Sequence, residues 1–98
     1  MPGDNLDIHP EALDEAQAAF LWYSERSDAA GDSFMVELDR GIDQILERPQ
    51  TWPRYLYGTQ RYLLRRYPFF VVYRPKAEEV QVIAVAHAKR RPGYWKHR

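Results

Sequence analysis

The feature of this sequence that most restricts its fold is a pair of short runs rich in β-branched and aromatic residues. The runs cover residues 69–73 and 80–85, and residues 75–79 between them have the proline and charged residues of a turn. Such runs are typical of two strands joined as a hairpin. In residues 80–86 both alternating sets of side chains are apolar, which predicts a central strand covered on both faces. The chain must therefore build a sheet, and its other segments must cover that sheet.

A first amphipathic helix is predicted near the start of the chain. Pro10 suits the first helical position, where its missing N–H would have had no partner, and the acidic residues that follow complement the helix dipole. Apolar residues then recur at helical spacing, namely Leu13, Ala16, Phe20 and Tyr23. We expect this helix to end near residues 27–30, with Gly31 as a stop or turn.

A second helix follows, and its apolar stripe is the clearest in the chain. Asp32 or Ser33 is the expected N-cap, and the helix should end at Arg48, because proline disfavours helical geometry in the residue before it. The stripe consists of Phe34, Met35, Leu38, Ile42, Ile45 and Leu46. Two helices joined by a few polar residues form an antiparallel hairpin, whose apolar side the sheet would cover.

The remaining segments complete the sheet. Leu6–Ile8 is a candidate first strand, residues 49–59 form a connector punctuated by proline and glycine, and residues 60–66 alternate as a further strand. The predicted order is β-α-α-β-β-β, an α+β fold in which a helical hairpin packs on one face of a small, mostly antiparallel sheet. At 98 residues and without internal repeats, the chain is expected to form a single domain over residues 1–98.

Composition excludes several classes of protein. The chain has no cysteine, so disulfides and thiolate metal sites are impossible. His9, His87 and His97 lack the spacing of metal ligands, and we expect neither a metal nor a cofactor. No apolar run approaches the ~20 residues needed to span a bilayer. We therefore expect a cytoplasmic protein without a membrane partner.

Charge is distributed very unevenly along the chain. Residues 1–51 contain three cations and twelve acids, whereas residues 52–98 contain eleven cations and two acids, so a net charge of zero hides halves of −9 and +9. Such segregation favours an anionic partner on one surface. The alternative is that acidic helices simply neutralise a basic sheet, and the sequence leaves both interpretations open.

Several short motifs recur in an order that resembles a known family. They are His9-Pro10-Glu11, Trp22-Tyr23, Leu46-Glu47-Arg48-Pro49, Arg65-Arg66-Tyr67-Pro68-Phe69, Val72-Tyr73-Arg74, and the run from Val85 to Trp95. Together they resemble the RelE/ParE superfamily of toxins from bacterial type II toxin–antitoxin modules. The resemblance covers roughly residues 6–95. It implies a compact toxin that is held inactive by an antitoxin encoded beside it.

The superfamily divides by activity, and the resemblance leaves two functions open. RelE-like members cleave mRNA at the ribosome, whereas ParE-like members poison DNA gyrase. RelE-like enzymes carry lysines around the strand that corresponds to residues 60–66, and this chain has none there. The run His-x-Lys/Arg-Arg-Arg-Pro, present here at residues 87–92, is commoner in ParE-like and plasmid-stabilisation members. A decayed, inactive toxin is a third possibility.

The candidate site residues follow from these two functions. A metal-free nuclease needs a proton acceptor, a cation at the phosphate and a proton donor, for which we select His87, Arg65, Arg91 and Tyr94. For binding nucleic acid or another target we select Arg61, Arg65, Arg74, Lys89, Arg90, Arg91 and Trp95. We expect these cations, which lie far apart in the sequence, to gather into one anion-binding patch.

The expected partners are an antitoxin and either DNA gyrase or the ribosome with its mRNA. Antitoxins of this class usually wrap the toxin with a helix and an extended segment, and the extended segment can add to a sheet edge. We expect an acidic antitoxin segment to meet Arg65, Arg74 or Arg90. The free toxin is a candidate homo-oligomer. We also expect Arg65 or Arg66 to pair with a helix carboxylate such as Asp39 or Asp43.

Overall fold

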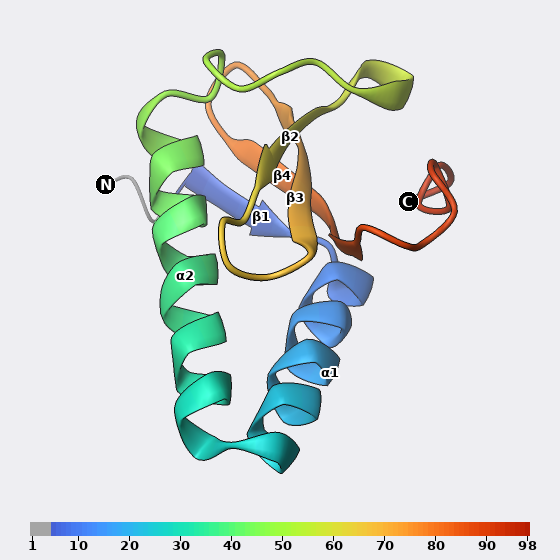
Figure 1. Cartoon of the computed structure of the whole chain (residues 1–98). Coiled ribbons are helices and arrows are strands. Elements are labelled where there is room, and N and C mark those ends of the chain that lie inside the picture. The colour runs from blue at the N-terminus through green and yellow to red at the C-terminus, as the bar shows by residue number, and fades with distance from the viewer. Residues whose placement is uncertain (1–4) are drawn as a thin grey trace.

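The computed structural model describes residues 5–98 and confirms the predicted element order. Its elements are β1 (Leu6–Ile8), α1 (Pro10–Arg26), α2 (Asp28–Glu47), the 3-10 turn η2 (Leu56–Gly58), β2 (Gln60–Leu63), β3 (Phe69–Pro75) and β4 (Val80–His87). The four strands form one sheet in the order β1-β4-β3-β2, in which only the β1–β4 pair is parallel (Figure 1). The fold is therefore α+β with a mostly antiparallel sheet, as predicted.

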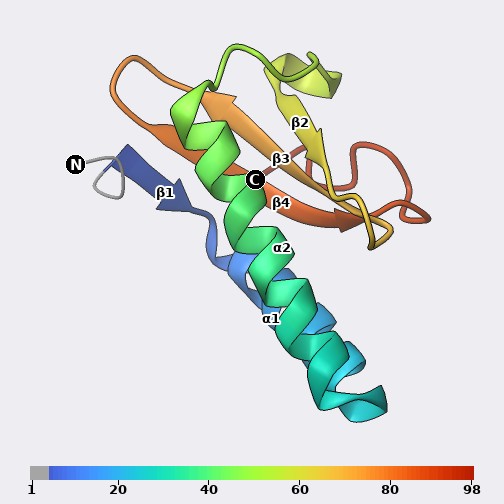
Figure 2. The same cartoon turned by 60° about the vertical axis from the view of Figure 1, so that its left-hand side comes forward.

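The two helices lie side by side along one face of the sheet (Figures 1 and 2). Their apolar stripes meet that face in one core, which includes Phe34 and Leu38 of α2 and Val71 and Tyr73 of β3. On the opposite face, Val72, Ile83 and Ala84 form a second, smaller core, which Trp95 of the C-terminal segment covers. Strand β4 lies between β1 and β3 and is buried on both faces, which confirms its prediction as a central strand.

The junction between the helices differs from the sequence prediction. Helix α1 ends at Arg26 and α2 begins at Asp28, so that Ser27 alone joins them, and its Oγ caps α2 by accepting a hydrogen bond from the N–H of Ala30. The prediction of Asp32 or Ser33 as the cap is wrong, and so is the prediction of Gly31 as a stop. Gly31 lies inside α2, where a Cβ would come within 1.9 Å of Ser24 Oγ. This glycine therefore permits close packing of α1 against α2 rather than a turn.

Strand β2 is shorter than residues 60–66 because the backbone turns away after Leu63. The N–H groups of Arg65 and Arg66 both donate to Oε2 of Glu37 on α2, the second over 3.0 Å, instead of continuing the strand ladder. Within residues 5–98, neither arginine forms an ion pair with Asp39 or Asp43, so that prediction is wrong. Glu37 instead anchors the β2–β3 loop to α2 through backbone groups.

The far end of the helical hairpin extends beyond the sheet (Figures 1 and 2). There the guanidinium of Arg26 lies over the Trp22 ring at 3.4 Å and donates to the Trp22 carbonyl. Across residues 5–98, neither helix combines the length and the apolarity required to cross a bilayer.

Candidate functional site

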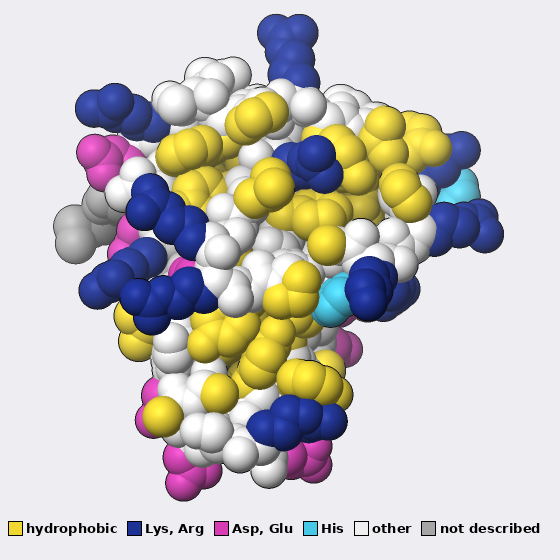
Figure 3. Space-filling view, in the orientation of Figure 1, with side chains coloured by type: hydrophobic (Ala, Val, Ile, Leu, Met, Phe, Trp, Pro, Cys, Tyr) yellow, Lys and Arg dark blue, Asp and Glu magenta, His cyan; other side chains and the backbone are white. Residues whose placement is uncertain are grey.

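The predicted site residues lie in three separate places and do not form one patch. Arg61 and Arg74 lie by the sheet face that no helix covers, Arg65 faces α2 across a cleft, and His87 to Trp95 lie at and beyond the end of β4. In the face shown in Figure 3, Lys and Arg side chains correspondingly form separate groups at the left and at the right, with hydrophobic atoms between them. The expectation of a single anion-binding patch is therefore wrong, because the sheet separates Arg61 from Arg65.

His87 ends β4 on the side of the sheet that the helices cover. It is paired with Phe69 of β3, and the two rings meet edge to face with their centroids 4.9 Å apart. Its Nδ1 accepts a hydrogen bond from the backbone N–H of Lys89 at 3.0 Å. An imidazole that accepts at Nδ1 carries its proton on Nε2 when it is neutral, so its free nitrogen is a donor. As arranged, His87 is suited to shaping the turn after β4 rather than to removing a proton.

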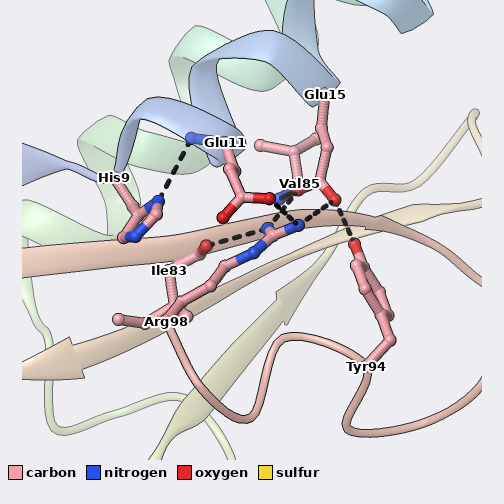
Figure 4. Close-up of polar contacts among 7 residues, drawn as sticks. All are labelled: His9, Glu11, Glu15, Ile83, Val85, Tyr94 and Arg98. Carbon is pink, nitrogen blue, oxygen red and sulfur yellow. Dashed lines mark hydrogen bonds and ion pairs between the residues drawn. The ribbon is translucent and has the colours of Figure 1, made fainter.

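Tyr94 belongs to a polar cluster that joins the C-terminal segment to α1 (Figure 4). Its hydroxyl donates to Oε2 of Glu15 over 2.6 Å, and the Arg98 guanidinium donates to both oxygens of the same carboxylate, over 2.9 and 3.0 Å. Glu15 also accepts from the N–H of Val85 in β4. A single carboxylate thus holds α1, β4 and the end of the chain together. We name Glu15, Tyr94 and Arg98 the C-terminal clamp.

Burial and the contacts with Glu15 together shift the pKa values of Tyr94 and Arg98 in the clamp. Burial first, and then the hydrogen bond and charge of Glu15, raise the pKa of the Tyr94 hydroxyl far above its ordinary value. Burial by itself would lower the pKa of Arg98, but its hydrogen bonds to Glu15 and the charge of that carboxylate outweigh this and raise it. The Tyr94 hydroxyl therefore stays protonated and donates a hydrogen bond to Glu15. No sequence signal identified Glu15 or Arg98, because 83 positions separate them.

On the helix-free side of the sheet, Arg61 lies across two aromatic rings. Its guanidinium carbon is 4.2 Å from the centre of the Tyr55 ring and 5.0 Å from that of Phe70. Trp95 supports this arrangement from beneath, since it is 1% exposed and packs against Tyr55. We call the surface formed by Tyr55, Tyr57, Arg61, Phe70 and Arg74 the arginine–aromatic platform. Buried Trp95 can contribute to binding only by holding this platform in place.

Tyr57 is the most exposed aromatic ring of the platform, at 51%. Its backbone has φ = 58°, a left-handed conformation that a bulky residue rarely adopts. Arg74 Nη2 donates to its carbonyl over 3.2 Å, and its ring packs edge to face on Trp95 and lies above Gly93, where a Cβ would come within 2.7 Å of it. Backbone strain of this kind tends to occur at functional sites. Here it holds an exposed aromatic ring on Trp95, with the Lys96 ammonium 5.1 Å from the centre of that ring.

The platform belongs to a stretch of chain without any acidic residue. Between Glu47 and Glu78 the sequence contains seven cations, namely Arg48, Arg54, Arg61, Arg65, Arg66, Arg74 and Lys76. Arg61 and Arg74 take part in none of the ion pairs within residues 5–98. An aromatic surface with unneutralised guanidinium groups is suited to binding an anionic or mixed polar partner.

The groups expected of a nuclease are not assembled around one phosphate position. Arg65 lines the cleft against α2, His87 points its ring at Phe69 on the helix-covered side, and Tyr94 is bonded to Glu15. Arg91 is exposed in the turn beyond β4. Among residues 5–98, no three His, Asp or Glu side chains are close enough together to hold a metal ion.

Comparison with known proteins identifies relatives of this architecture. The family model described as the ParE toxin of the type II toxin–antitoxin system parDE matches residues 6–92. No curated protein sequence matches the chain. Among solved structures, the chromosomal ParDE toxin–antitoxin system from P. aeruginosa is similar, with a TM-score of 0.75 and 18% identity, over 87% of this chain and 96% of that one. At that identity the structural likeness shows the fold alone.

Proposed function

Since this chain belongs to the ParE toxin family of type II toxin–antitoxin systems, we propose that it inhibits growth by binding DNA gyrase and is neutralised by a cognate antitoxin. The choice of gyrase over mRNA rests on one observation, which is that the side chains needed for RNA cleavage lie apart. The Tyr94 hydroxyl donates a hydrogen bond to Glu15. The Nδ1 of His87 accepts a hydrogen bond from Lys89, which leaves Nε2 of the neutral ring as a donor. A nuclease would require both to break these bonds before any proton moved.

The arginine–aromatic platform is the surface we propose for gyrase. Guanidinium and aromatic groups dominate the binding energy of protein interfaces, because they bury large areas and form several polar contacts at once. Arg61 is held across Tyr55 and Phe70, so it loses little freedom when a partner binds. The exposed side chain of Leu63, which is paired with Phe70, extends the same side of the molecule with apolar area.

A gyrase assay with two matched variants tests this assignment. Purified toxin should inhibit supercoiling of relaxed plasmid and trap covalent gyrase–DNA adducts. Arg61→Gln should require about tenfold more protein for the same effect, because an interface arginine of this kind contributes a kcal/mol or more. Arg48→Gln is the control, since Arg48 is exposed at the end of α2, away from the platform, and should act like the parent.

The alternative activity, cleavage of mRNA at the ribosome, is tested by a different assay. Primer extension on mRNA from cells that express the toxin should reveal no new cleavage sites, while the SOS response is induced. Discrete cuts without gyrase adducts would establish ribosome-dependent RNA cleavage instead. If expression left growth unaffected, and neither adducts nor cuts appeared, the chain would be an inactive toxin.

For the antitoxin we propose a helix docked on the outer side of the helical hairpin. An apolar hollow of about 380 Å³ lies there, lined by Leu13, Ala16, Gln17, Phe20 and Met35. Leu13 in the wall of this hollow and Leu21, one helical turn after Gln17, are also exposed, so they add apolar area there. An amphipathic helix that places its apolar stripe in this hollow would remove both from water. Leu13→Asp should then abolish co-purification of the antitoxin, whereas Glu25→Gln, farther along α1, should not.

A further inference from the structure

A cleft of about 670 Å³ lies between α2 and the sheet edge, on the opposite side of β2 from the platform. One wall is α2, and the other is formed by β2 and the segments before and after it. Gly41 of α2 lets the Tyr62 ring lie against the helix, since a Cβ there would come within 2.9 Å of that ring. We call this feature the α2–β2 cleft. It shares no residue with the platform or with the hollow on the helical hairpin.

Three guanidinium groups line one end of the cleft. Arg40 comes from α2, and Arg65 and Arg66 come from the β2–β3 loop. Helical side chains lean toward the N-terminus of their helix, which brings Arg40 toward the two loop arginines. Within residues 5–98, the three guanidinium groups take part in none of the ion pairs or side-chain hydrogen bonds. They are therefore free to bind an external anion.

The charge at this end of the cleft matches a phosphate group. Glu37 lies there too, but its carboxylate accepts hydrogen bonds from the backbone N–H groups of Arg65 and Arg66 and so fixes the loop. Three guanidinium groups and this one carboxylate give a net charge of +2. A phosphate monoester carries about −1.5 to −2 at pH 7, and guanidinium groups bind its oxygens in pairs.

The opposite end of the cleft is aromatic. Tyr62 and Trp52 pack edge to face with their ring centres 4.7 Å apart, and both rings are half-buried, so each keeps part of its surface open to the cleft. Asp43 and Gln44 of α2 line the cleft at this end. Their side chains place a carboxylate and an amide within the same wall as the rings, where they suit the polar edge of a planar ligand.

Three contacts fix the order of these groups along α2. The loop that contains the two arginines is bonded to Glu37, the Tyr62 ring rests at Gly41, and the Trp52 indole N–H donates to the Gln44 carbonyl over 3.3 Å. From Glu37 to Gln44 the helix advances about 10 Å at 1.5 Å per residue. The anionic group and the planar group of a ligand would therefore lie side by side along the helix.

The aromatic end is held in place before any ligand binds. Gln60 is 7% exposed, and its Nε2 donates to the carbonyls of Trp52 and Pro49 over 2.7 and 2.9 Å. The indole N–H bond to α2 fixes the same tryptophan from the other side. A ligand therefore meets a formed surface, and little of the binding free energy is lost in ordering it.

We propose that the α2–β2 cleft binds a nucleotide, with its 5′-phosphate on the three guanidinium groups and its base on the Tyr62 and Trp52 rings. Bases stack on aromatic side chains, and the amino group of a base donates to a carboxylate such as Asp43. That carboxylate also repels a second phosphate, so the ligand has one anionic end and one neutral, planar end. A volume of about 670 Å³ lies within the ~300–1,000 Å³ of small-molecule sites. This site does not depend on the proposed function.

The three tryptophans of the chain make the site observable by NMR. Trp52 lies in the cleft, whereas Trp22 lies on the helical hairpin and Trp95 is buried on the other face of the sheet. Isotope-labelled full-length chain from cell-free synthesis would be titrated with guanosine 5′-monophosphate, whose base has an amino group and a ring N–H side by side. We expect the Trp52 indole signal to move while those of Trp22 and Trp95 stay in place.

Fragments of the same nucleotide separate the two ends of the cleft. Guanosine lacks the phosphate and ribose 5-phosphate lacks the base, so each should bind at least tenfold more weakly than the whole nucleotide. Inorganic phosphate should leave the Trp52 indole signal in place, because the guanidinium groups lie at the other end of the cleft.

Paired variants separate the cleft from general attraction between opposite charges. Arg40→Gln with Arg66→Gln should raise the Kd of the nucleotide about tenfold or more, because hydrogen bonds between charged groups are the strong ones, and should leave the Kd of guanosine unchanged. Lys76→Gln with Arg91→Gln removes the same charge from the turns at the two ends of β4 and should change the Kd less than twofold. All four side chains are exposed, so the variants should keep the parent indole spectrum.

Three results would overturn the proposal. The first is a Trp52 signal that does not respond to the nucleotide, or a Kd that both variant pairs raise equally. The second is inorganic phosphate or ribose 5-phosphate that binds as tightly as the nucleotide, which would indicate a site for small anions. The third is a single-stranded oligonucleotide that binds at least tenfold more tightly than the nucleotide, which would indicate a nucleic-acid strand as the ligand.

Discussion

Replacing Glu15 with glutamine removes the negative charge at the centre of the C-terminal clamp while retaining side-chain size and helix propensity. The Glu15 side chain is 16% exposed and that of Arg98 is 11% exposed, so their ion pair is largely shielded from solvent. Glu15 accepts four hydrogen bonds, from Val85, Tyr94 and two nitrogens of Arg98. The glutamine oxygen can satisfy about half of these donors, and the buried guanidinium loses its counter-charge.

The expected cost is about 3 kcal/mol in the free energy of unfolding. Breaking a buried ion pair from one side costs about 3–5 kcal/mol, and the lower end applies because Arg98 keeps its contact with Glu11 and its hydrogen bond to the Ile83 carbonyl. Against a total stability of about 5–15 kcal/mol this is a large fraction. At roughly 4–8 °C per kcal/mol for a chain of this size, Tm should fall by about 15 °C.

Urea denaturation followed by tryptophan fluorescence measures this loss, and Glu11 provides the control. Glu11 lies one helical turn before Glu15 and 3.7 Å from the same Arg98, but its side chain is 62% exposed. Glu11→Gln should cost less than about 0.5 kcal/mol, because exposed pairs contribute little. Equal losses for the two variants, or a loss at Glu15 that disappears in 0.5 M salt, would refute the claim that the clamp is buried.

The remaining predictions concern packing and alkaline pH. Gly31→Ala should cost about 1–3 kcal/mol, because its Cβ would collide with Ser24 Oγ, and adding Ser24→Ala should restore part of that loss in the same denaturation assay. Gly58 and Gly93 both have positive φ, but only Gly93 lies against a ring, so Gly93→Ala should be the more destabilising by thermal melts, and equal shifts would contradict the packing on Tyr57. Burial raises the pKa of Tyr73 from 10.0 to about 12, so the stability that this group contributes is complete below pH 10 and is lost as pH rises toward 12. Urea midpoints between pH 9 and 11.5 should fall accordingly, and less steeply in Tyr73→Phe; parallel profiles for the two proteins would contradict this.

The local pattern of apolar, β-branched and proline residues was sufficient to predict the order of the helices and strands. The helical stripes, the β-branched runs and the proline after Arg48 predicted the order of elements and the central place of β4, because hydrophobic periodicity reports directly which side of an element is buried. The family resemblance agreed with that order. Gly31 shows the limit of such reasoning, since glycine serves equally at a turn and at a close contact between helices, and only the neighbouring Ser24 distinguishes the two.

The placement of the charged side chains depended on tertiary structure. The separation of acidic and basic residues along the chain was visible in the sequence. The alternation of side chains along β2 places Arg61 on the helix-free side of the sheet, and the end of β2 at Leu63 places Arg65 against α2. The partnership of Glu15 with Arg98 joins the first helix to the last residue, and no local pattern encodes it. Periodicity is a property of neighbours in sequence, whereas a site depends on which distant side chains the folded backbone brings within reach of one another.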